Sequence, residues 1–302
     1  MRRLIVVYNP NSSRFADVKE CVLDKIKMIS GYLVGKYEIK EIGIEGNVKQ
    51  LSKIIEDGDL VISAGGDATG VIVANSVLRS GKDAIVSVLP YGNFNDFSRT
   101  LGVKKIEGIF SKKSKSEKFY PLEIIVDGKL FRYATCYVTI GMTAEAVKLY
   151  DEPGMRKKLK HNYGRSVSSY TELVKWYFKN RHRKEFLPQF KLNGELQKKG
   201  ISDYVAVNGK YMARVMKCGR NYDNKKIFYS KVEKLSSLWR LTKLMVRSLV
   251  YRIPGDETSG DIIEFEKPAT VKIHAEGEFG KFDGVKKIEI KKGAKWLKVI
   301  KA

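Results

Sequence analysis

Residues 60–70 read Leu60-Val61-Ile62-Ser63-Ala64-Gly65-Gly66-Asp67-Ala68-Thr69-Gly70, an apolar strand that runs through paired glycines into a helical stretch. Glycines at such a junction let the backbone approach a ligand closely, and the N–H groups that begin a helix attract anions. Asp67 would cap the helix or orient a metal-bound water, and Thr69 would donate its hydroxyl to a phosphate. Taken alone, the loop is equally compatible with an ordinary tight turn.

The surrounding sequence alternates between strands and helices. The expected strands are Leu4–Tyr8, Tyr37–Ile44, Leu60–Ser63 and Ile85–Leu89, and the expected helices are Asp17–Tyr32, Val48–Glu56 and Thr69–Leu78. This alternation predicts a doubly wound α/β domain with a mostly parallel sheet. Ligands of such sheets bind at the carboxyl ends of the strands, where residues 63–69 and 90–96 both fall.

After Pro121 the pattern changes to strands with alternating apolar and polar residues. The strand-like segments are Leu122–Val126, Lys129–Thr139, Phe186–Leu192, Tyr204–Asn208, Ile227–Val232, Ile262–Phe265 and Thr270–His274, with helical stretches inserted near 156–179 and 231–252. We therefore predict an antiparallel, β-sandwich-like second domain. The expected domains are 1–121 and 122–284, and the last strands, 286–290 and 296–300, close the second domain or return to the first.

Composition narrows the classes of partner. The 302 residues hold 57 Lys and Arg against 34 Asp and Glu, a net charge of +23, which attracts nucleic acid, anionic membranes or phosphate-rich substrates. Nucleic acid ranks last because the sequence shows no aromatic RNA-binding motif or recognition helix. Three widely spaced cysteines, Cys21, Cys136 and Cys218, and apolar runs too short to span a bilayer predict a cytoplasmic protein with reduced thiols.

A second loop follows the next strand, with the sequence Leu89-Pro90-Tyr91-Gly92-Asn93-Phe94-Asn95-Asp96-Phe97-Ser98-Arg99. Together, Gly65–Thr69 and Leu89–Arg99 resemble the GGDGT and LPxGTxNDFAR motifs of the diacylglycerol-kinase-type lipid kinases, which include sphingosine and ceramide kinases. Further segments that resemble the family are Asn9-Pro10, Ile140–Ala144, Val205–Gly209 and Glu276-Gly277-Glu278. The resemblance implies that residues 285–302 pack back on the nucleotide-binding domain.

The resemblance also implies a reaction and its residues. The expected activity is transfer of the γ-phosphate of ATP, with Mg²⁺, to a lipid hydroxyl, diacylglycerol by default. Glu278 would act as the base and Asp67 would assist catalysis. The nucleotide or its metal would contact Asn9, Gly65, Gly66, Asp67, Ala68, Thr69 and Gly92, while Asn95 and Asp96 hold the loop and orient metal-bound waters. Asp223 is the nearest match to the family's structural magnesium ligand.

Several residues depart from the family pattern inside these loops. Ala68 replaces a glycine, and if that position had a positive φ its β-carbon would cost about 1–2 kcal/mol. Ile72 stands where the family has Glu, Asn93-Phe94 replaces Thr and Gly, and Ser12-Ser13-Arg14 replaces a glycine-containing turn. Two interpretations stay open: an enzyme that binds nucleotide in a modified way, or a pseudokinase that kept the fold as an anionic-membrane-binding protein.

Basic and aromatic residues favour contact with a membrane surface. Arg156, Lys157, Lys158, Lys160 and Arg165 precede a stretch with Tyr170, Trp176, Tyr177 and Phe178, and a second such stretch carries Trp239. Amphipathic helices of this kind suit an interface, although packing on their own domain explains them as well. We expect a peripheral membrane protein, with a homodimer left open. A NAD kinase-like enzyme, which shares the first loop, is the remaining rival.

Overall fold

A six-stranded sheet forms the centre of the N-terminal domain, with strand order β2-β1-β3-β4-β18-β5. The computed structural model describes residues 2–12, 14–28, 31–92, 95–151, 165–180, 186–197, 200–209, 211–212, 216–217, 225–233, 239, 242–243, 246, 255–276 and 278–301. In the described part of this domain the elements are β1 (Arg2–Tyr8), α1 (Phe15–Val18), a π-helical and a 3₁₀ turn (Lys19–Asp24, Lys25–Met28), β2 (Tyr32–Glu38), α2 (Gly43–Ser52), β3 (Leu60–Gly65), α3 (Asp67–Ser80), β4 (Ile85–Pro90), α4 (Asp96–Leu101), α5 (Ile106–Ile109) and β5 (Lys115–Phe119).

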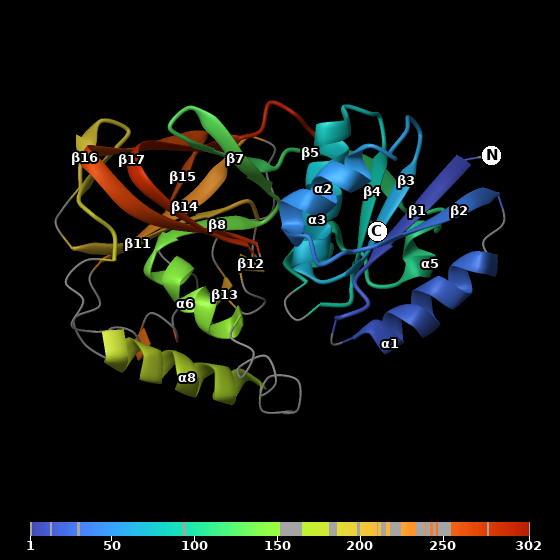
Figure 1. Ribbon diagram of the computed structural model, residues 1–302, viewed down its shortest axis with the longest axis horizontal. Coiled ribbons are helices and arrows are strands. Elements are labelled where there is room, and N and C mark those ends of the chain that lie inside the picture. The colour runs from blue at the N-terminus through green and yellow to red at the C-terminus, as the bar shows by residue number, and fades with distance from the viewer. Residues whose placement is uncertain are drawn as a thin grey trace.

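The four strands β2, β1, β3 and β4 are parallel, as the βα alternation predicts. Figure 1 shows α2 and α3 on the face of this sheet that is turned toward the second domain, and α1 and α5 on the opposite face. Both faces are thus covered at the centre of the sheet, which is why β3 is apolar and buried at every position. The carboxyl ends of β3 and β4 open onto the two glycine loops.

The second expected strand and helix were placed too late in the sequence. β2 begins at Tyr32, and α2 begins at Gly43, which has a φ of 73°. The side chain of Asn47 fixes this boundary, because its Oδ1 accepts from the Lys40 N–H at 2.9 Å and its Nδ2 donates to the Gly43 carbonyl at 2.7 Å. A buried asparagine inside the helix is not visible as a start signal in hydrophobic periodicity.

The second domain contains a ten-stranded antiparallel sheet among the described residues, ordered β15-β14-β11-β8-β16-β17-β6-β7, with β9 and β10 off this path. Its elements are β6 (Leu122–Val126), β7 (Lys129–Ala134), β8 (Tyr137–Gly141), α6 (Met142–Asp151), α8 (Arg165–Asn180), β9 (Phe190–Leu192), β10 (Glu195–Leu196), β11 (Ile201–Val207), β12 (Tyr211–Met212), β13 (Met216–Lys217), β14 (Ile227–Glu233), β15 (Asp256–Thr258), β16 (Gly260–Ala275) and β17 (Glu278–Lys292). The sheet wraps around its own apolar core, which includes Leu122, Ile140, Phe190, Tyr204 and Ile273.

The chain crosses between the domains twice. It leaves the first domain at Tyr120-Pro121 and returns after β17 to form β18 (Leu297–Lys301), which pairs with β4 and β5. The two crossings are joined where the Gly293 N–H donates to the Pro121 carbonyl at 2.7 Å. Of the tail expected to pack on the first domain, residues 285–292 instead belong to β17, because they continue its pairing with β6 and β16.

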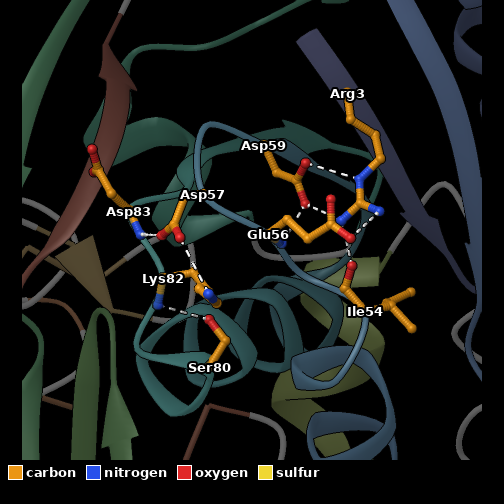
Figure 2. A network of polar contacts seen from close by, with 8 residues as sticks. All are labelled: Arg3, Ile54, Glu56, Asp57, Asp59, Ser80, Lys82 and Asp83. Carbon is orange, nitrogen blue, oxygen red and sulfur yellow. Dashed lines mark hydrogen bonds and ion pairs between the residues drawn. The ribbon is translucent and has the colours of Figure 1, made fainter.

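The amino edge of the parallel sheet, opposite the glycine loops, carries its own polar network (Figure 2). Asp59 is buried and accepts from Arg3 at 2.9 and 2.7 Å and from the Glu56 N–H at 2.7 Å. The Asp83 N–H donates to Asp57 at 2.8 Å. These contacts fix the turns that precede β3 and β4, so both strands enter the sheet in a set register.

Candidate active site

The two glycine loops touch each other at the carboxyl edge of the sheet. The Tyr91 N–H donates to the Gly65 carbonyl at 3.2 Å. A β-carbon on Gly92 would lie 2.2 Å from the Gly66 Cα, and one on Gly66 would lie 3.2 Å from the Gly92 Cα. Backbone contact this close leaves no space for a β-carbon at Gly92, and a β-carbon at Gly66 would require the Gly92 backbone to move by a few tenths of an ångström.

The first turn of α3 is packed against the loop that precedes it. A β-carbon on Gly65 would lie 2.4 Å from Thr69 Oγ1, and the Thr69 side chain is buried. Gly66, the N-cap residue, has an extended backbone, and no side-chain hydrogen bond caps this end of the helix among the described residues. The N–H groups that begin this long helix therefore face the loop region, an arrangement suited to an anion.

Asp67 joins the two loops. Its carboxylate accepts from the Asn95 N–H at 2.9 Å and the Asp96 N–H at 2.8 Å, so it caps α4 rather than its own helix. Burial raises the pKa of Asp67, although these hydrogen bonds favour the charged form.

Asn95 closes the second loop. It has a left-handed φ of 58°, its Oδ1 accepts from the Gly92 N–H at 2.7 Å, and its Nδ2 donates to the Gly92 carbonyl at 2.9 Å. Asp96 is buried, with one oxygen 3.7 Å from the Arg99 guanidinium. Asn95 thus holds the loop through both atoms of its side-chain amide, whereas Asn93 and Phe94 lie outside the described residues.

Asn9 lies at the end of β1, where its Oδ1 accepts from the Asn11 N–H at 2.9 Å. Nearby, Arg14 reaches the second loop: its guanidinium donates to the Pro90 carbonyl at 3.2 Å and lies 5.5 Å from the centre of the Tyr91 ring. Burial raises the pKa of Tyr91 to about 12. The sequence marked Arg14 only as a departure from the family pattern, since its contacts depend on a chain segment 76 residues away.

The glycine-to-alanine departure at position 68 carries no backbone strain. Ala68 is the second residue of α3, and its φ is not positive. The conditional cost expected from the sequence therefore does not arise. Ile72 is buried in the apolar core one turn later, and Gly70 also lies inside the helix.

The acidic turn of the second domain places its two glutamates in different surroundings. Glu278, the expected base, forms an ion pair with Arg132 of β7. Glu276 is buried and accepts from Thr135 N at 2.5 Å and from Thr135 Oγ1 at 2.9 Å. Burial raises the pKa of Glu276 to about 7, with a further contribution from the negative charge of Asp67.

The effect of the Asp67 charge on Glu276 indicates that the first glycine loop and the acidic turn lie near each other. The pKa of Tyr137, raised mainly by burial, is also raised by Asp96, Asp67 and Glu276, so both loops and the acidic turn share one neighbourhood. Asp223 lies outside the described residues. Within the described ranges, no group of three or more His, Cys, Asp or Glu side chains could hold a metal. Asp67 and Asp96 fit a Mg²⁺ only if phosphate oxygens complete its coordination, which is how Mg²⁺ is usually held at phosphate sites.

Known proteins share part of this sequence. Residues 3–121 match the family described as "Diacylglycerol kinase catalytic domain". This part of the chain is similar to that family. Diacylglycerol kinases of Staphylococcus carnosus (strain TM300) and Staphylococcus aureus (strain JH9) are each 30% identical to it, over 102 and 103 residues. These matches cover 33% and 34% of this chain and 33% and 32% of the relatives, so they span about a third of either protein.

The likeness to the diacylglycerol kinase fold extends beyond this domain. A solved diacylglycerol kinase structure from Bacillus anthracis str. Sterne superposes with a TM-score of 0.66 and 16% identity, covering 100% of this chain and 97% of the other. The overall fold, an α/β domain followed by an antiparallel domain, is therefore that of this structure. In the described part of the chain, no helix is both long and apolar enough to cross a membrane.

Proposed function

We propose that this chain is a lipid kinase that transfers the γ-phosphate of ATP to a lipid hydroxyl, with diacylglycerol as the default acceptor and phosphatidic acid as the product. The observation that carries the proposal is the contact between Gly66 and Gly92 beside the uncapped start of α3. The diacylglycerol kinase catalytic-domain family supports it, because this contact lies within residues 3–121.

In this proposal each group has a role that phosphoryl transfer requires, namely positioning, charge neutralisation and proton acceptance. The glycine loops let the backbone approach the phosphates, and the N–H groups of α3 bind phosphate oxygens. Glu278 accepts the proton of the lipid hydroxyl while the hydroxyl oxygen bonds to the γ-phosphorus. The bond between the γ-phosphorus and the oxygen of ADP breaks, and ADP leaves. Arg132 orients Glu278. A Mg²⁺ held by Asp67 or Asp96 together with the phosphates would neutralise their charge.

The test is a transfer assay with γ-labelled ATP and a panel of lipid alcohols in vesicles, with NAD as a non-lipid acceptor. We expect label on a lipid for the wild type and a loss of at least about 100-fold for Glu278→Gln. Lys82→Ala, in an exposed ion pair at the opposite edge of the sheet, is the control expected to keep transfer. Label on NAD alone would support a NAD kinase-like enzyme instead.

A second candidate is a pseudokinase that binds anionic membranes. It is favoured by the Arg132–Glu278 ion pair, because a carboxylate held by a guanidinium is a weaker base than a free one. If no acceptor is labelled while the protein binds anionic vesicles, this candidate replaces the first.

Membrane attachment is proposed for both candidates. Phe178 on α8 is 40% exposed and Trp239 is 74% exposed, and aromatic side chains at such positions suit a lipid interface. The basic residues 156–164 and 181–184 lie outside the described residues. Flotation with vesicles that contain phosphatidylglycerol should recover the protein, and Trp239→Ala should weaken recovery. Equal recovery with neutral phosphatidylcholine vesicles would contradict an electrostatic attachment.

A further inference from the structure

Five consecutive residues at the end of β7, Arg132–Cys136, bind both domains at once, and we call them the coupling segment. All five are buried: Arg132–Ala134 end β7, and Thr135 and Cys136 make the turn into β8. Backbone groups in such a place must be hydrogen-bonded, because an unpaired buried group costs the full desolvation of that group. Pairing with β6 satisfies part of this backbone, and side chains from separate parts of the chain bond to Tyr133, Thr135 and Cys136.

On the side of the first domain, the partner is Asn75 of α3. Its Nδ2 donates to the Tyr133 carbonyl at 2.9 Å, and its Oδ1 accepts from the Tyr133 N–H at 3.1 Å. The same Nδ2 also donates to the Val71 carbonyl at 2.9 Å, within α3. One amide therefore replaces a neighbouring strand for Tyr133 and fixes α3 to β7. This is the helix whose first turn is proposed to bind phosphate.

On the other side, the partners are the two glutamates of the acidic turn. Glu276 accepts from the N–H groups of Thr135 and Cys136 and from the Thr135 hydroxyl. Arg132, the first residue of the segment, forms the ion pair with Glu278. Both carboxylates of the turn are thus held by residues within four positions of one another.

A second buried asparagine secures the segment at the point where the chain crosses between domains. The Asn208 N–H donates to the Cys136 carbonyl at 2.6 Å, and its Nδ2 donates to the carbonyls of Thr135 and Tyr120, both at 3.0 Å. Lys292, at the end of β17, donates to Asn208 Oδ1. The segment is therefore tied to the outgoing crossing as well as to α3 and the acidic turn.

We propose that the coupling segment sets the position of Glu278 relative to α3, and that Asn75 is a positioning residue for the phosphoryl transfer. The inference rests on the proposed function of Glu278. A shift of α3 against the acidic turn would break buried hydrogen bonds at Tyr133, Thr135 or Cys136. The shift is therefore either resisted or passed along the segment to Arg132 and Glu278. Asn75 touches neither reactant and acts through this chain of contacts.

Hydrogen exchange tests the coupling without any need for activity. Asn75→Ala removes the link. Ser76→Ala is the matched control, because in the described part of the chain buried Ser76 bonds only within the first domain, to the Ile72 and Val48 carbonyls at 2.7 and 3.4 Å. We expect Asn75→Ala to speed exchange at least about tenfold at Thr135 and Cys136 and in a peptide spanning Glu278–Phe282, with Ser76→Ala leaving both at the wild-type rate. Faster exchange confined to Tyr133 would overturn the proposal.

Kinetics then separate positioning from nucleotide binding. We expect Asn75→Ala to lower kcat about tenfold or more with the KM for ATP within about twofold, and Asn75→Asp, which keeps the acceptor for the Tyr133 N–H, to be intermediate. In an Arg132→Lys background, Asn75→Ala should cost less than in the wild type, since both changes act on Glu278. Equal effects in both backgrounds would refute the coupling. If the wild type labels no acceptor, the proposed function fails and the exchange result alone decides whether the two sides are coupled.

Discussion

At the scale of single residues, the site is defined by how closely backbone can approach backbone. Gly66 and Gly92 are in contact because neither carries a β-carbon, while Asp67 and Asn95 hold the two loops in that position. A glycine in these loops therefore has a packing reason, distinct from the positive φ that often explains conserved turns.

Gly92→Ala and Gly70→Ala form a matched pair that tests this packing. The new β-carbon at position 92 would lie 2.2 Å from the Gly66 Cα, whereas at position 70 its nearest contacts are Phe97 and Val88 at 3.6 Å. We expect Gly92→Ala to lower the free energy of unfolding by about 2 kcal/mol or more, and Gly70→Ala to raise it by up to about 1 kcal/mol because a helix interior favours alanine. Urea unfolding measures both, and equal effects would contradict the contact.

Glu276 gives the protein a pH dependence of known sign. Its pKa is raised from 4.5 to about 7 in the folded state, so the folded protein holds this proton more tightly than the unfolded chain. Stability from this group is therefore greatest below pH 4.5 and is lost as the pH rises toward 7, on the order of 3 kcal/mol in total.

The variant Glu276→Gln isolates that contribution. As the pH rises from 5 to 7.5, the unfolding free energy of the wild type should fall relative to that of the variant. Above that range the difference between them should stay constant. Urea unfolding at fixed pH values measures the difference. A difference independent of pH would show that Glu276 is ionised throughout.

At the scale of elements, the two edges of the parallel sheet have separate tasks. The carboxyl edge holds the glycine loops, and the amino edge is fixed by polar contacts among Arg3, Asp59 and the turns before β3 and β4 (Figure 2). Stability changes at the amino edge should therefore leave the chemistry at the opposite edge intact.

Arg3→Met and Lys82→Ala compare a buried contact with an exposed one at that edge. Asp59 is buried, so removing Arg3 leaves a desolvated carboxylate and should cost about 1–2 kcal/mol. The Lys82–Asp57 ion pair is exposed on both sides, and its loss should leave the unfolding midpoint unchanged within error. Unfolding curves decide, and a larger loss for Lys82→Ala would contradict this account of the network.

Helices and strands with a strong hydrophobic periodicity could be predicted from the sequence. Boundaries that depend on contacts between residues far apart in the sequence could not. The strand that ends at Gly65, the helix after it and the second loop all follow from local pattern, as does the antiparallel character of the second domain. The segment Lys129–Thr139, expected as one strand, is two, β7 and β8. The turn between them is held by Glu276, 141 residues away from Thr135, and hydrophobic periodicity contains no signal of such a partner.

At the scale of the whole molecule, the relation between the domains was the least predictable feature. The motifs identified Glu278 and the glycine loops, but the contacts that unite them run through Asn75, Arg132 and Asn208, none of which lies in a glycine loop or the acidic turn. Buried asparagine and arginine side chains act here through partners more than 50 residues away. Their roles follow from the assembled fold.

We propose above that this assembly moves phosphate from a nucleotide to a lipid through Glu278. The most direct measurement is the initial rate of label transfer from γ-labelled ATP to diacylglycerol in anionic vesicles, for the wild type and for Glu278→Gln, with the unfolding curves of both recorded. The account predicts transfer by the wild type and a loss of at least about 100-fold in a variant that is equally stable. Transfer that persists in Glu278→Gln at the wild-type rate would contradict it.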